Sequence, residues 1–330
     1  MTWRIVLLAL LHGSAWYLAA QNTSPAAYQE LARDIFKELI GINTTDSSGS
    51  TTRAAEAMAA RLRAAGFADQ DVKVLGPHPG KGNLVARLRG AGARKPILLL
   101  AHLDVVEARR QDWSVDPFTL LERDGFFYGR GTGDDKAMAA VWIANLIRYK
   151  QEGFRPDRDL IVALTADEEV TSEYNGVDWL LKNHRELLEA DFCLNEGGGG
   201  QIKSGRYILN KVQASEKVFQ SFRLEVKNPG GHSSLPVKDN AIYRLAEGLT
   251  RLAKFDFPVE LNEVTRNFFA RMAALEEGQL AADMKAAART PPQASAVARL
   301  SRSAFYNAQM RTTCVATLLE GGHAENALPQ

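Results

Sequence analysis

Histidine and carboxylate side chains follow several apolar runs of this sequence, and these are side chains that bind metal ions. The motif His102-Leu103-Asp104 comes directly after the apolar run at residues 96–101. Further motifs carry acidic or imidazole groups: Gly133-Asp134-Asp135-Lys136, Asp167-Glu168-Glu169, Asn195-Glu196-Gly197 and Gly230-Gly231-His232-Ser233-Ser234. Together these groups are typical of a hydrolase site that holds two metal ions.

His102 alone leaves two interpretations open, because a histidine after a buried strand is more often a satisfied polar residue than a metal ligand. Asp104 favours the interpretation of His102 as a metal ligand, since residues two apart in an extended segment lie on the same face. From there its carboxylate can accept the second imidazole N–H and fix the tautomer that a metal requires. The pair therefore predicts a positioned metal ligand.

Alternate glycines precede Asp134 in the segment 129–134. A phosphate cradle is the alternative, but the segment lacks the Gly-Lys-Ser/Thr end of a P-loop and the spacing of a dinucleotide fingerprint. We expect the glycines to allow a tight bend that delivers Asp134 to the rim of a sheet, where its two oxygens can bridge two metals. Asp135 is open to interpretation as a helix N-cap neighbour, and Lys136 as a solvated residue.

Glu168 and Glu169 follow an apolar run, where adjacent like charges repel unless a positive charge lies nearby. A metal ion would supply that charge, and a surface acidic pair is the structural alternative. Because neighbouring side chains diverge, one glutamate can bind a metal while the other stays free. A free glutamate beside a metal is the usual general base of a hydrolase.

The elements expected around these motifs form an α/β sheet. Helical spacing predicts helices at residues 26–39, 51–65, 137–150 and 177–188. Apolar runs predict strands at residues 83–88, 96–101, 160–165 and 191–195, and a hairpin that turns at residues 123–125. Ligands collect at the carboxyl ends of strands in such sheets. We therefore expect His102, the Glu168-Glu169 pair and Glu196 to converge on one rim.

A second, smaller α+β domain is expected after residue 210, so that a catalytic domain spans residues 21–210 and the second domain residues 211–330. Within the second domain we expect strands at residues 218–226 and 312–319. A helix is expected at residues 241–252, followed by a long helical tract at residues 261–300. The stretch 282–289 of that tract is expected to be a solvated helix face.

Composition excludes several classes of protein. The chain has 330 residues, of which 45% are hydrophobic and 24% charged, as in ordinary soluble domains. A net charge of +1 does not favour nucleic acid, so we expect a small-molecule partner. Cys193 and Cys314 cannot form a disulfide framework and are expected to be buried thiols, which leaves oxygen and imidazole to hold any metal.

Residues 1–20 combine Arg4, an apolar stretch and small residues at the end. This pattern predicts a secretory signal peptide rather than a membrane span, with an uncleaved anchor or a first core helix as the alternative. We therefore expect a secreted or periplasmic protein without stable membrane insertion. The glycosylation sequons at Asn22 and Asn43 matter only in a eukaryotic host.

Taken in order, from about residue 27 onwards, the motifs resemble those of the dizinc exopeptidase family of aminoacylase, carnosinase, carboxypeptidase G and succinyl-diaminopimelate desuccinylase. The resemblance implies a zinc-exopeptidase-like α/β sheet flanked by helices, with an inserted α+β lid and dimerisation domain. It also implies two Zn²⁺ ions per subunit. His102, Asp134 and Glu196 would bind one of them, and Asp134 and Glu169 would contribute to the other.

The resemblance also implies catalytic and substrate-binding roles. Asp104 would orient His102, and Glu168 would be the acid/base. His232 would reach the active site of the other subunit of a homodimer and stabilise the oxyanion. Arg311 and Asn326 would lie near the carboxylate and carbonyl of the substrate, a small peptide or an N-acyl amino acid.

The sequence departs from the family pattern at its end. Family members continue beyond an Asn-Ala-Leu-Pro segment into a final part of the catalytic domain, and this sequence stops at Gln330. We therefore expect the second zinc to be one protein ligand short, because His184 and His323 lie in no matching motif. A truncated or catalytically dead member that acts as a binding protein is the alternative to an active enzyme. A serine hydrolase is a third possibility, but no Gly-x-Ser-x-Gly elbow occurs.

Overall fold

The structure is a computed structural model that describes residues 25–170, 172–214 and 216–330, so the predicted signal peptide at residues 1–20 lies outside the described residues. The chain divides into two compact units, of which the first ends at Glu196 and the second begins at Gly197. The boundary predicted from the sequence lies after residue 210. The difference is the hairpin of β8 (Gly199–Lys203) and β9 (Arg206–Lys211), which groups with the second unit.

A five-stranded mixed sheet in the order β1-β2-β6-β3-β7 forms the centre of the first unit. Its strands are β1 (Val72–Leu75), β2 (Asn83–Leu88), β3 (Ile97–His102), β6 (Leu160–Thr165) and β7 (Phe192–Leu194). Strand β3 is parallel to β6 and β7, while β2 is antiparallel to β1 and β6. The parallel strands β3, β6 and β7 therefore direct their carboxyl ends to one edge, as the sequence predicted.

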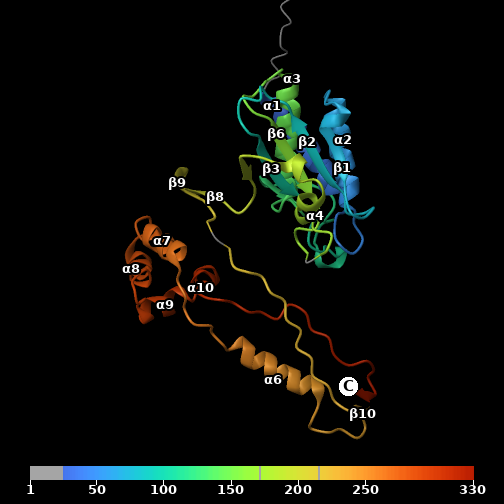
Figure 1. Cartoon of the computed structure of the whole chain (residues 1–330). Helices are drawn as coiled ribbons and strands as arrows, with labels where there is room; N and C mark the ends of the chain where they lie inside the picture. Colours follow the sequence, from blue (N-terminus) through green and yellow to red (C-terminus); the bar gives the residue numbers. More distant parts are fainter. Residues whose placement is uncertain (1–24, 171, 215) are drawn as a thin grey trace, which may run out of the picture. The chain divides into compact units, whose positions relative to one another are not determined.

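Helices cover both faces of this sheet (Figure 1). One face packs against α1 (Pro25–Gly41), α2 (Thr51–Ala64) and α3 (Lys136–Gln151), and the other against α4 (Gly176–Asn183) and α5 (Arg185–Leu188). Alternation along β6 divides its side chains between the two cores: Val162 and Leu164 face α1–α3, while Ile161 and Ala163 face α4 and α5. The predicted α/β fold is confirmed.

Short elements connect these layers. The 3₁₀ turns Asp69–Asp71 and Arg110–Asp112 precede β1 and follow β3, respectively. The predicted hairpin forms from β4 (Leu121–Arg123) and β5 (Phe126–Tyr128). Asp124 and Gly125 have φ angles of 54° and 79° at its turn, which is the left-handed geometry that suits a tight hairpin.

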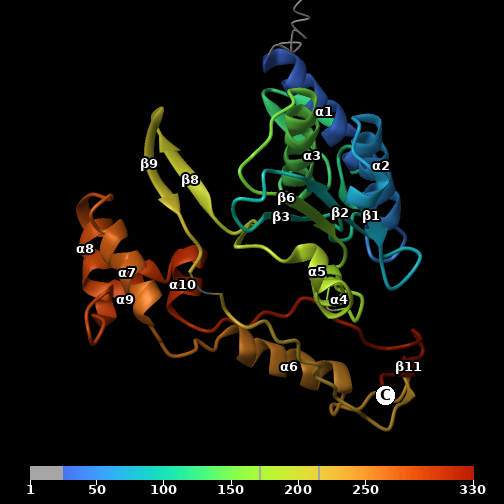
Figure 2. The same ribbon diagram turned by 45° about the horizontal axis from the view of Figure 1, so that its top comes forward.

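The described residues of the second unit form five helices and two short strands in addition to the β8–β9 hairpin (Figure 2). They are β10 (Gly231–His232), α6 (Ala241–Ala253), α7 (Glu263–Met272), α8 (Gly278–Ala287), α9 (Ala294–Leu300), α10 (Ala304–Met310) and β11 (Ala327–Leu328). The long helical tract predicted at residues 261–300 is interrupted. Gly278 has a φ of 61° at the start of α8, and Pro291 and Pro292 separate α8 from α9.

The prediction of a solvated helix face at residues 282–289 is wrong. Asp283, Met284, Ala286 and Ala287 are buried, because α8 packs against both α7 and α9. Met284 and Ala287 join a small apolar core of this unit around Phe269. Alanine-rich segments carry little hydrophobic signal in sequence, but they let helix backbones approach closely.

Two other sequence predictions also differ from the structure. The segments 218–226 and 312–319 form no strand, and apolar side chains in them are exposed, for example Val218 at 94% and Leu318 at 91%. Both cysteines are free and exposed rather than buried, because Cys193 lies on the edge strand β7 and Cys314 in one of these segments. None of the helices in the described part of the chain has the length and apolar character that a membrane span requires.

Candidate metal centre

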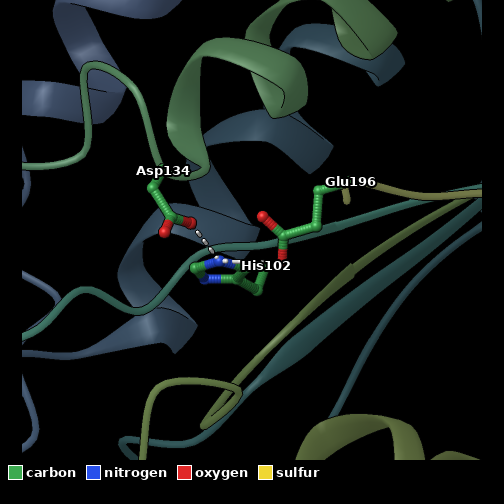
Figure 3. A group of neighbouring side chains, drawn as sticks. All are labelled: His102, Asp134 and Glu196. Carbon is green, nitrogen blue, oxygen red and sulfur yellow. Dashed lines mark hydrogen bonds and ion pairs between the residues drawn. The ribbon is translucent and has the colours of Figure 1, made fainter. Parts of the chain in front are cut away.

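The carboxyl edge of the sheet brings together one histidine and two carboxylates (Figure 3). His102 is the last residue of β3. Asp134 lies just before α3, which begins at Lys136, and Glu196 follows the end of β7. One ligand atom from each lies within 4.8 Å of the other two. The His102 Nε2 atom is 2.8 Å from Asp134 Oδ1 and 3.7 Å from Glu196 Oε1. The structure therefore brings together the three side chains predicted for the first metal site, from three segments far apart in sequence.

The His102 ring is buried, and its second nitrogen, Nδ1, contacts Asp104. Its Nδ1 lies 3.0 Å from the backbone carbonyl oxygen of Asp104 and 3.6 Å from the carboxylate Oδ1 of the same residue. An Nδ1–H donated to that carbonyl leaves Nε2 directed toward Asp134 and Glu196. Burial acts to lower the pKa of His102, but the bonds to Asp104 and Asp134 outweigh it and raise the pKa to about 10. Asp104 thus orients the ring mainly through its backbone, whereas the sequence pointed to its carboxylate.

The carboxylate of Asp104 has a different partner. It is buried, and its Oδ2 accepts the backbone N–H of Glu169 at 2.9 Å. Burial alone would raise the pKa of Asp104, but His102 and the Glu169 N–H hold it below its ordinary value. Asp104 therefore connects the end of β3 to the loop after β6.

Glu168 and Glu169 lie in different environments. The Glu168 side chain is 51% exposed, with Oε2 4.0 Å from His102 Nε2. Glu169 is partly buried, and burial together with the charge of Asp134 raises its pKa. One carboxylate of the pair is accessible to water and the other is crowded by neighbouring acids, while their predicted division into a free base and a metal ligand stays a prediction.

The side chains at this edge fit a divalent cation. Burial raises the pKa of Glu196 as well as that of Glu169, and repulsion from Asp134 adds to both effects, so the protein does not fully balance these negative charges. Asp104 Oδ1 is buried without a hydrogen-bond partner among the described residues. Imidazole nitrogen and carboxylate oxygen are ordinary ligands of zinc.

Asp135 and Lys136, which follow Asp134, are buried in a way that the sequence did not indicate. Asp135 is buried, accepts the backbone N–H of His102 at 3.3 Å, and has its pKa raised to about 7 by burial. Lys136 is 0% exposed, so its interpretation as a solvated residue is wrong. Its Nζ donates to the carbonyl oxygens of Leu39 at 2.9 Å and Ile42 at 2.7 Å, at the C-terminal end of α1. The apolar residues that follow Lys136 were the available signal of its burial.

His232 and Asn326 are brought together within the second unit. His232 pairs with Ala327 in the β10–β11 ladder, and the Ser233 N–H donates to the Asn326 carbonyl oxygen at 3.0 Å. The Ser234 N–H donates to His232 Nδ1 at 3.2 Å. Because Nδ1 accepts this bond, a neutral ring carries its proton on Nε2, where it is available as a donor.

Arg311 follows α10 and lies against other parts of the second unit. Its guanidinium donates to the Phe257 carbonyl oxygen at 3.3 Å and to Ser301 Oγ at 3.0 Å, and its side chain is 9% exposed. Its Nε is buried without a partner among the described residues. The predicted role of Arg311 near a substrate carboxylate stays a prediction.

Several known proteins are similar to this chain in sequence. The model of peptidase family M20/M25/M40 matches residues 98–326. The N-fatty-acyl-amino acid synthase/hydrolase of Xenopus tropicalis is 31% identical over 238 residues, which cover 71% of this chain and 46% of that protein. The succinyl-diaminopimelate desuccinylase of Delftia acidovorans is 34% identical over 209 residues, covering 60% of this chain and 51% of that protein. The chain thus spans about half the length of these relatives.

A solved structure has the same fold. The M20 family metallo-carboxypeptidase of Sulfolobus solfataricus superposes with a TM-score of 0.57 at 16% sequence identity, covering 90% of this chain and 68% of that one. At this identity the comparison concerns the fold alone.

Proposed function

The chain belongs to peptidase family M20/M25/M40, and from this membership we propose that it hydrolyses an amide or peptide bond next to a free carboxylate in a metal-dependent reaction. The observation that carries the proposal is the cluster of His102, Asp134 and Glu196, whose ligand atoms lie within 4.8 Å of one another. Relatives named for N-fatty-acyl amino acids and for succinyl-diaminopimelate support a substrate with an acylated amine beside a carboxylate, such as a small peptide or an N-acyl amino acid.

We propose zinc as the metal. His102, Asp134 and Glu196 would hold one ion, while Asp134 and Glu169 would contribute to a second. When bound, zinc supplies Lewis acidity that polarises the substrate carbonyl and makes a water molecule easier to deprotonate. Asp104 keeps the His102 ring in the orientation that leaves Nε2 available as a ligand.

Proton transfer is assigned to Glu168. Its carboxylate is exposed and lies 4.0 Å from His102 Nε2, so a water at this edge is within its reach. Glu168 would accept the proton of the attacking water and return it to the leaving amine. Because both steps need a carboxylate that is not itself a ligand, the exposed member of the pair is the better candidate.

Residues of the second unit would complete the reaction. We propose that His232 donates its Nε2–H to the oxygen of the scissile carbonyl, where negative charge develops in the transition state. In a homodimer this donor would come from His232 of the partner subunit. Arg311 and Asn326 would hold the substrate carboxylate and carbonyl. We also propose that the protein is exported, on the basis of the basic, apolar and small residues in positions 1–20.

Zinc titration of the metal-free chain tests the metal centre directly. Wild-type protein should bind zinc, and His102→Ala should lose the bound zinc together with any release of an amino acid from an N-acyl amino acid. His323→Ala is the matched control, because His323 is exposed in the second unit and should leave both unchanged. Zinc binding by His102→Ala at wild-type affinity, or hydrolysis in the presence of a strong chelator, would contradict the proposal.

A further inference from the structure

Lys81 connects three segments near the carboxyl edge of the sheet. It lies in the loop between β1 and β2, and its Nζ is 2.6 Å from Asp46 Oδ1 and 2.7 Å from Asp167 Oδ1. Asp46 belongs to the loop after α1, and Asp167 to the loop after β6. One ammonium group therefore joins two carboxylates from loops that are distant in sequence.

The two carboxylates are not equivalent. The Asp167 side chain is 1% exposed, and its Oδ2 is buried without a partner among the described residues, whereas the Asp46 side chain is 55% exposed. A buried carboxylate requires a counter-ion, and removing the partner of such a pair is strongly destabilising. An exposed pair contributes little. Lys81 therefore acts mainly on Asp167.

Asp167 lies in a turn whose backbone is fixed at several points. Its φ of 57° is in the left-handed region, which is unusual for a residue other than glycine. Asn83 accepts the Ala166 N–H at 2.8 Å, and Asn175 donates to the Asp167 carbonyl oxygen at 2.9 Å. Lys81 adds the third restraint, on the Asp167 side chain.

This turn is followed directly by Glu168, the predicted acid/base, and Glu169, a predicted metal ligand. Glu168 and Glu169 follow Asp167, and the Glu169 N–H donates to Asp104 Oδ2 at 2.9 Å. The turn is therefore restrained at two points. Lys81 binds the side chain of Asp167, before the two glutamates, and Asp104 binds the backbone N–H of Glu169. Since Asp104 also fixes the His102 ring, the position of the turn and the position of the ring are coupled.

We propose that Lys81 is a positioning residue that holds Asp167, and through it the turn that directs Glu168 and Glu169 to the edge carrying His102. The catalytic meaning of this role rests on the proposed function, but the role itself concerns only the conformation of the turn. Lys81 is predicted to touch neither metal nor substrate.

A second ion pair of the same sheet provides a matched control. Arg87, near the end of β2, donates to Asp159 Oδ2 at 2.9 Å, and Asp159 precedes β6. Because β2 and β6 are antiparallel, Lys81–Asp167 and Arg87–Asp159 connect the same two strands at opposite ends. Arg87→Met should disturb the sheet but leave the metal edge in place.

The test compares Lys81→Met, Asp46→Asn and Arg87→Met in the 330-residue chain. Hydrogen–deuterium exchange of metal-free protein should be about tenfold or more faster in Lys81→Met at the amides of residues 166–169. These amides should exchange at close to wild-type rates in Asp46→Asn and Arg87→Met. Zinc affinity should fall about tenfold in Lys81→Met alone, the usual size for residues that orient metal ligands.

Wild-type exchange at residues 166–169 in Lys81→Met, or equal acceleration in Arg87→Met, would overturn the proposal. If Lys81→Met does not fold, Lys81→Met combined with Asp167→Asn removes the unpaired buried charge, and the same faster exchange is expected in it. Wild-type exchange in that double variant would equally refute the role of Lys81. If wild-type chain takes up no zinc, the proposed function fails, while the exchange comparison still decides the role of Lys81.

Discussion

At the level of single residues, this site separates chemically identical groups by their surroundings. Glu168 is half exposed, while burial and the neighbouring Asp134 raise the pKa of Glu169. Asp104 is buried too, but His102 nearby and the Glu169 N–H keep its pKa below the ordinary value. Hydrogen bonds and exposure, and not residue type, therefore distinguish these carboxylates, in line with the different roles proposed for them.

Exchanging either glutamate for its amide should distinguish these roles. Glu168→Gln should lower kcat on an N-acyl amino acid by about 10²–10⁴-fold and leave zinc affinity close to wild type, because only the proton acceptor is removed. Glu169→Gln should instead weaken zinc binding. Parallel measurement of kcat and of zinc affinity in both variants checks the assignment. The reverse pattern would show that the two roles are exchanged.

At the level of elements, strand β6 carries a paired carboxylate beyond each of its ends. Asp159 precedes the strand and accepts bonds from the Gly90 N–H at 2.8 Å and from Arg87 at 2.9 Å. Asp167 follows the strand and pairs with Lys81. The sheet register is thus fixed by ionic contacts at both ends as well as by the apolar side chains between them.

Asp159 should make the stability of the first unit depend on pH. Burial acts to raise its pKa, but the Gly90 N–H and Arg87 outweigh this and lower the pKa in the folded state. An unfolded aspartate has a pKa of about 3.9. The folded chain therefore binds fewer protons, so this stabilisation is fully present above that value and is lost as the pH falls through the lower, folded pKa.

Asp159→Asn is expected to lower the free energy of unfolding by about 1 kcal/mol at neutral pH, after allowance for solvent screening of a partly exposed pair. The loss should shrink in acid. Urea unfolding of both proteins between neutral and acidic pH measures it. A difference that stays constant over this range would show that the charge of Asp159 makes no contribution.

At the level of the whole molecule, each unit has its own apolar core. The first unit packs helices on both faces of its sheet, and helices α7–α10 of the second unit contribute to a core around Phe269, Met284 and Leu300. All three residues of the candidate metal centre, His102, Asp134 and Glu196, belong to the first unit. Metal binding should therefore be separable from the stability of the second unit.

Phe269→Ala tests this separation. Phe269 is 0% exposed, so its truncation should destabilise the second unit by about 3–5 kcal/mol. Zinc affinity should not change. Phe305→Ala is the control, because Phe305 contacts Phe268 in the same region but is 51% exposed. Hydrogen exchange of α7–α9 and zinc titration give the two readouts, and loss of zinc binding in Phe269→Ala would argue against independent units.

In two exposed apolar segments of the second unit, the strands predicted from the sequence do not form. Alternating apolar residues at 218–226 and 312–319 predicted strands, but neither segment has a paired strand in the described chain. Periodicity reports which face of a segment is apolar, whereas a strand also needs a partner for its backbone groups. The burial of residues 283, 284, 286 and 287 was missed for the converse reason, because helix packing and not hydrophobicity decides it.

The sequence by itself determined the α/β fold, most of the strands and helices of the first unit but not β1, and the acidic and histidine residues that gather at its carboxyl edge. These depend on local periodicity and on the rule that loops after parallel strands meet at one edge. Tertiary structure alone decided that the Asp104 backbone holds the His102 ring, that Lys136 is buried under α1, and that Lys81 reaches Asp167. Such contacts join residues far apart in the chain or depend on the direction of a backbone carbonyl. A local sequence pattern predicts neither the long-range contact nor the carbonyl direction.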